Sequence, residues 1–66
     1  MQIFLNGESQ EIVNALSIDE LLAQLNLVNK RIAVEVNQEI IPRGLHATTL
    51  LQEGDAVEVI HAIGGG

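Results

Sequence analysis

The sequence predicts an α+β domain in which about five strands form a mixed sheet and one main helix packs across it. Three observations predict this class: short segments of alternating apolar residues, an Asn-Gly turn motif and one helix-start motif. The 66 residues leave room for one small domain, and 47% hydrophobic residues supply enough apolar material for its core. We assign residues 1–63 to this domain and residues 64–66 to a flexible glycine tail.

The first predicted element is a β-hairpin. Residues 2–6 alternate between apolar side chains on one side and Phe4 with polar neighbours on the other. An Asn-Gly pair follows at residues 6–7, and this pair tolerates the positive φ angles of a tight type I′ turn. Residues 8–13 are therefore expected to return as the second strand.

The second predicted element is the helix. Residues 17–20, Ser-Ile-Asp-Glu, have the form of a capping box, in which both polar side chains bond amides of the first turn. One apolar stripe at helical spacing follows: Ile18, Leu21, Leu22 and Leu25. We expect this stripe to lie on the sheet and Asn26 to end the helix.

The second half of the chain predicts the remaining strands. Residues 31–37 alternate again, and a short segment at 39–41 is stopped by a proline. Residues 43–51 have no clean period and are expected to wrap an edge as a loop or short helix. A turn at 52–55 leads into a final strand over 56–63. This order of elements is that of the ubiquitin-like β-grasp fold, whose first and last strands lie parallel in the middle of the sheet.

Composition and charge exclude several function classes. The net charge of −6 disfavours nucleic acid and anionic membranes as partners, and the absence of cysteine removes thiolate chemistry. The acidic residues are spread singly, and His46 and His61 lack the spacing of a helical metal pair, so we expect neither catalytic residues nor a metal site. The N-terminal segment does not have the pattern of a signal peptide, and a cytoplasmic location is expected.

The glycine run Gly64, Gly65 and Gly66 is the candidate reactive site. A phosphate-binding loop would have to continue into a helix, and none follows. A frayed end or an engineered scar is one explanation. The functional alternative is that a tail without side chains threads a narrow channel of another enzyme and presents its carboxylate there. Three extended residues reach about 10 Å.

A partner-binding patch is predicted around Phe4, the only aromatic residue. Alternation places Phe4 on the face opposite its two apolar neighbours in the first strand. If the first and last strands are parallel neighbours, Ile60 shares this open face, and Glu35 and Glu58 lie nearby as an acidic rim. Clustered exposed apolar residues indicate a recognition surface. The competing account is that residues 43–51 fold over this face and bury Phe4.

Over essentially its whole length the chain resembles the sulfur-carrier (ThiS) family of thiamine biosynthesis. The resemblance is carried by the hairpin at Asn6-Gly7, the helix start Asp19-Glu20-Leu21-Leu22, residues 36–43 (Val-Asn-Gln-Glu-Ile-Ile-Pro-Arg), Gly54-Asp55-x-Val57 and the terminal glycines. We interpret residues 36–43 as mainly architectural, with Arg43 alone as a residue that touches a partner.

The resemblance implies a carrier and co-substrate, itself neither an enzyme nor dependent on a cofactor, and monomeric when free. The Gly66 carboxyl is adenylated with ATP by an E1-like (ThiF-like) partner. Sulfur from a donor such as a cysteine desulfurase then makes it a thiocarboxylate for thiazole synthase (ThiG-like). A small subunit of molybdopterin synthase (MoaD-like), a ubiquitin-like protein modifier and a bare binding domain remain as alternatives at this point.

Overall fold

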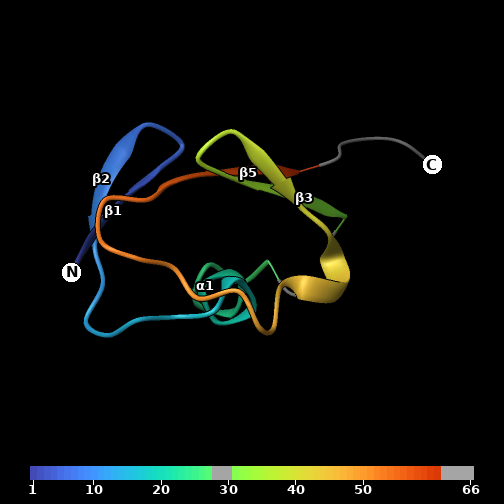
Figure 1. Cartoon of the computed structure of the whole chain (residues 1–66), viewed down its shortest axis with the longest axis horizontal. Coiled ribbons are helices and arrows are strands. Elements are labelled where there is room, and N and C mark those ends of the chain that lie inside the picture. The colour runs from blue at the N-terminus through green and yellow to red at the C-terminus, as the bar shows by residue number, and fades with distance from the viewer. Residues whose placement is uncertain (28–30, 62–66) are drawn as a thin grey trace.

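The computed structural model describes residues 1–27 and 31–61. Figure 1 shows a sheet with one helix across one of its faces. The elements are β1 (Gln2–Leu5), β2 (Glu8–Glu11), α1 (Ile18–Gln24), β3 (Ile32–Val36), β4 (Glu39–Ile41), the 3-10 helix η1 (Arg43–Leu45) and β5 (Ala56–His61). The predicted α+β class is confirmed.

The five-stranded sheet has the order β2-β1-β5-β3-β4. β5 runs parallel to β1, with Leu5 opposite Val57. On its other side β5 runs antiparallel to β3, with Val34 opposite Val59. The last strand therefore lies between the first and the third, and the predicted central parallel pair of a mixed β-grasp sheet is confirmed.

Both hairpins use tight turns with positive φ at two successive residues. Asn6 (φ 49°) and Gly7 (φ 83°) join β1 to β2, which confirms the predicted type I′ turn. Asn37 (φ 53°) and Gln38 (φ 69°) join β3 to β4 in the same way without a glycine. Asparagine tolerates this region better than most residues, so the second hairpin needs no glycine at its first position.

α1 is fixed at both ends by local hydrogen bonds. The Ser17 hydroxyl accepts from the Glu20 amide over 3.1 Å, and the Glu20 carboxylate accepts from the Ser17 amide over 2.8 Å. This reciprocal pair is the predicted capping box. At the other end Asn26 (φ 59°) is left-handed, and the Leu27 amide donates to the Leu22 carbonyl over 2.9 Å. This Schellman arrangement ends the helix where the sequence predicted.

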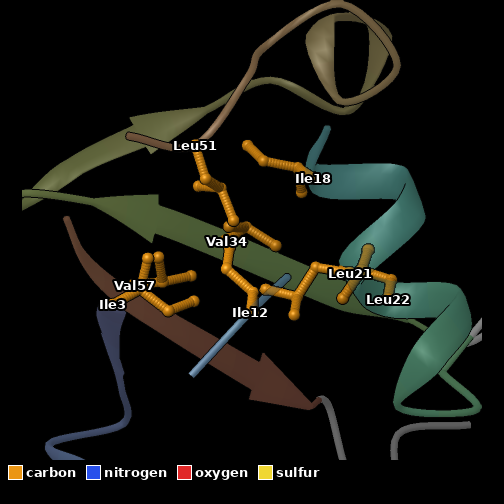
Figure 2. Close-up of a cluster of buried hydrophobic side chains, with 8 residues drawn as sticks. All are labelled: Ile3, Ile12, Ile18, Leu21, Leu22, Val34, Leu51 and Val57. Atoms are coloured by element: carbon orange, nitrogen blue, oxygen red, sulfur yellow. The ribbon is translucent and has the colours of Figure 1, made fainter. Parts of the chain in front are cut away.

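The core lies between α1 and one face of the sheet (Figure 2). Its buried members come from three strands, the helix and two connecting segments: Ile3, Ile12, Ile18, Leu21, Leu22, Val34, Leu51 and Val57. The turn into α1 begins earlier than expected, because Ile12 already points into the core and β2 stops at Glu11, two residues before the predicted boundary. Val13 is then 90% exposed.

The segment after η1 runs along the helix side of the sheet. The Ile18 amide donates to the Thr49 carbonyl over 3.1 Å, and the Leu51 amide donates to the Leu16 carbonyl over 2.8 Å. His46 is buried, with its Nε2 2.9 Å from the Ile41 carbonyl oxygen. The expected irregular segment with a short helix is therefore confirmed, and it leaves the opposite face of the sheet uncovered.

We expect Leu21→Ala to lower the free energy of unfolding by about 2–4 kcal/mol, because the cavity forms in a small core with few neighbours to close it. Urea denaturation measures this difference. The matched control is Val13→Ala, which removes an exposed apolar side chain and is expected to change stability by less than about 0.5 kcal/mol. Equal losses in the two variants would contradict this assignment of the core.

Candidate functional site

The candidate reactive site follows β5 along the chain. Gly64, Gly65 and Gly66 lie outside the described residues, as do the last two residues of the predicted final strand. Within the described part, β5 ends at His61, which lies opposite Ile32 of β3. In the sequence the tail thus follows the central strand of the sheet, with two residues between it and the strand's described end.

Asn6 holds β5 from the side of β1. Its backbone amide donates to the Val57 carbonyl over 2.8 Å. Its side-chain Oδ1 accepts from the Val59 amide, also over 2.8 Å. β1 itself pairs with β5 only as far as Leu5, so the Asn6 side chain continues the hydrogen-bond ladder where the strand has ended. This residue therefore positions the second half of β5.

Asn37 holds β5 from the side of β3. Its backbone amide donates to the Ala56 carbonyl over 2.7 Å, and its Oδ1 accepts from the Ala56 amide over 3.0 Å. Its Nδ2 donates to the Asp55 carboxylate over 3.0 Å. Sequence reasoning placed Asn6 only in a turn and Asn37 only in the architectural segment 36–43. It missed their bonds to β5 because nothing local in the sequence indicates a partner that far along the chain.

The face of the sheet opposite α1 carries exposed apolar side chains. Phe4 is 43% exposed and lies beside Ala56, and Ile60 is 51% exposed and lies opposite Ala33. Because the residues that alternate with these positions point into the core, this face is the open one. The predicted exposure of Phe4 and Ile60 is confirmed, and the account in which residues 43–51 bury Phe4 is wrong.

The two glutamates of the predicted patch occupy its middle. Glu35 and Glu58 are direct cross-strand partners on β3 and β5, and both lie on the open face. Along β5, Ala56 precedes Glu58 and Ile60 follows it, and Phe4 lies beside Ala56. The glutamate pair therefore lies between Phe4 and Ile60. The expectation of an acidic rim is therefore corrected to an acidic centre, because residues two apart on a strand share a face. Like charges opposite each other also lower stability.

An open hollow lies at the end of this face where β5 ends. It measures about 350 Å³ and is lined by Arg31, Ile32, Ala33, Arg43 and Ile60. We call it the arginine hollow. Two of the three basic residues of the chain line it.

The described ranges, 1–27 and 31–61, contain no group of three or more His, Cys, Asp or Glu that could hold a metal ion. His46 bonds the Ile41 carbonyl inside the fold, and His61 is exposed at the end of β5. Over the same ranges no helix has the length and apolar character that crossing a membrane requires.

Known proteins are similar to this chain over its whole length. The model of the ThiS family matches residues 3–66. The sulfur carrier protein ThiS of Escherichia coli (strain K12) is 33% identical over 66 residues, which cover 100% of both chains. A thiazole synthase of Magnetococcus marinus is 39% identical over 66 residues, which cover 100% of this chain and 20% of that protein. The chain thus spans about a fifth of the length of this relative.

A solved structure is similar over the same extent. The crystal structure of the thiamine biosynthesis protein ThiS from Geobacter metallireducens superposes with a TM-score of 0.85 and 32% sequence identity. The match covers 100% of both chains. The likeness therefore includes the central strand β5 and both hairpins.

We expect Glu58→Gln to raise the free energy of unfolding by about 0.2–1 kcal/mol, because it removes the repulsion between cross-strand glutamates. The measurement is urea denaturation at low salt, and added salt should reduce the gain. Glu8→Gln is the control, because it removes the same charge opposite Leu5. A stability gain in the control as large as that in Glu58→Gln would assign the effect to net charge instead.

Proposed function

The chain belongs to the ThiS family, and on that premise we propose that it carries sulfur for thiamine biosynthesis. The observation that carries the proposal is the full-length similarity to a protein named sulfur carrier protein ThiS, at 33% identity. The order of the chain supports it, because the glycine tail begins three positions after His61, the last residue of the central strand. A run of glycines has no side chains to obstruct entry into a channel.

The proposed reaction takes place at the Gly66 carboxylate. One carboxylate oxygen attacks the α-phosphorus of ATP, pyrophosphate leaves, and an acyl-adenylate forms. The terminal sulfur of a persulfide, from a donor such as a cysteine desulfurase, then attacks the carboxyl carbon, AMP leaves, and an acyl disulfide forms. A thiol attacks the donor's sulfur of that disulfide, so that the S–S bond breaks and the donor and the thiol become joined in a new disulfide. The product is a thiocarboxylate, in which sulfur has replaced one oxygen. The carboxylate is ionised at neutral pH, since its reference pKa is about 3.3–3.7.

In this proposal the partners supply the catalytic groups, and the chain is a co-substrate. The adenylating partner is an E1-like (ThiF-like) enzyme that binds the ATP. The sulfur acceptor is a thiazole synthase (ThiG-like). Similarity to a fifth of a protein named thiazole synthase supports this acceptor, because it joins a carrier-like region and a synthase in one chain.

The patch on the open face is the proposed docking surface for these partners. Phe4 and Ile60 supply exposed apolar area, and aromatic residues are enriched at interfaces. Glu35 and Glu58 add negative charge at its centre, which favours a partner with a basic side chain at the matching position. A partner on this face would sit beside the strand that leads into the tail.

We expect incubation with the adenylating enzyme, ATP and a sulfur source to replace one oxygen of the chain by sulfur. Intact-mass spectrometry measures this change. A variant with one alanine added after Gly66 should fold normally and stay unmodified, because the reacting carboxyl group is displaced. Val13→Ala should be modified like the unchanged protein. Thiocarboxylate on an extended chain that is not trimmed would overturn the carrier function.

We expect Phe4→Ser to weaken binding of the adenylating enzyme while the melting temperature stays within a few degrees. The loss of an apolar anchor at an interface costs about 1–2 kcal/mol of binding free energy or more. Isothermal titration calorimetry measures the affinity. Val13→Ser is the matched control, because Val13 is exposed outside the sheet. Equal affinities of the two variants would remove Phe4 from the docking surface.

A further inference from the structure

The arginine hollow lies where three strands come together at one end of the sheet. Ile32, at the start of β3, is opposite His61, at the end of β5. Arg31 directly precedes β3, and Arg43 is the first residue of η1, which follows β4. Figure 1 shows η1, in yellow, at the same end of the sheet as the end of β5. Antiparallel pairing thus brings together two arginines that are twelve positions apart in the sequence.

The charged residues that line the hollow have the sign opposite to the net charge of the chain. The chain has nine acidic and three basic residues, and two of the basic ones line the hollow. The other residues that line it are apolar: Ile32, Ala33 and Ile60. An apolar floor with guanidinium groups beside it fits an apolar side chain next to a carboxylate. Guanidinium groups bind carboxylates through two parallel hydrogen bonds.

We infer that the arginine hollow docks an acidic segment of the adenylating enzyme, next to the entrance of the channel that receives the tail. This inference rests on the proposed function. Ile60 belongs both to the hollow and to β5, so a segment seated here lies within a few residues of the start of the tail. An apolar side chain of the enzyme fills the hollow, and a neighbouring carboxylate bonds Arg31 and Arg43.

The hollow also makes the charge on the open face change from negative to positive along β5. The acidic centre at Glu58 precedes Ile60, and the arginine hollow follows at the end of the strand. A partner with a basic group and an acidic group in the matching order can bind only one way round. That order points the tail toward the channel, because the arginines mark the end from which the tail leaves.

The test measures steady-state adenylation by the purified enzyme of the same organism, with Arg31→Gln and Arg43→Gln as variants. Each should raise the KM for the carrier about tenfold, as expected for loss of one partner of a charge pair, and leave kcat unchanged. Gln10→Glu is the control: it makes the net charge more negative by the same amount on β2 and should leave KM within about twofold.

Further measurements separate the alternatives. Arg43→Lys keeps the charge without the planar fork and should give an intermediate KM. Melting temperatures close to that of the unchanged carrier show that the fold is intact. The inference would be overturned if the KM of both arginine variants equalled that of Gln10→Glu, or if only kcat were lowered. NMR shifts of the Ala33 and Ile60 amides with phosphate alone would assign the hollow to a small anion and also overturn it.

The outcome for the unchanged carrier tests the proposed function separately. If the unchanged carrier is adenylated and the arginine variants match the control, only the docking site is wrong. If the unchanged carrier is not adenylated, the proposed function fails and the docking site fails with it.

Discussion

The insertion of β5 between β1 and β3 is the constraint on which the rest of the structure depends. β1 contributes only a short parallel ladder, ending where Leu5 faces Val57, whereas β3 pairs with β5 along its length. The side chain of Asn6 bonds β5 beyond the end of β1, and Asn37 bonds it at its start. A central strand held from both sides has a fixed position in the sheet. It also forms part of both faces of the sheet.

The two faces of the sheet differ because the described residues form a single α-helix, which covers one of them. α1 and the segment after η1 both pack on the same face, and the core forms there. The other face keeps exposed apolar side chains such as Phe4, which in a free protein would favour self-association. Glu35 and Glu58 divide that surface and place like charges against any second copy. Under the proposed docking, the same charges that repel a second copy would attract a partner of opposite charge.

The sequence predicted those features that depend on short-range patterns. The first hairpin and the capping box follow from turn chemistry and capping residues within a few positions. The place of the last strand beside the first came instead from the likeness of the element order to the β-grasp fold. The pairing of Glu35 with Glu58 depends on strand register, which alternation alone does not fix. The contact of Asn6 with Val59 joins residues 53 positions apart. His46 lies in a segment without a period, so its burial could not be predicted.

The position of the last strand also determines when the domain can form. Leu5 and Val57 pair in the sheet although most of the chain lies between them in the sequence. Their pairing therefore closes a long loop, and non-local contacts of this kind form slowly. A nascent or partly unfolded chain lacks the central strand and therefore both the assembled core and the assembled open face. Such a chain still has its glycines but offers no rigid surface for an enzyme to bind. If the chain carries sulfur as proposed, only folded molecules can be loaded.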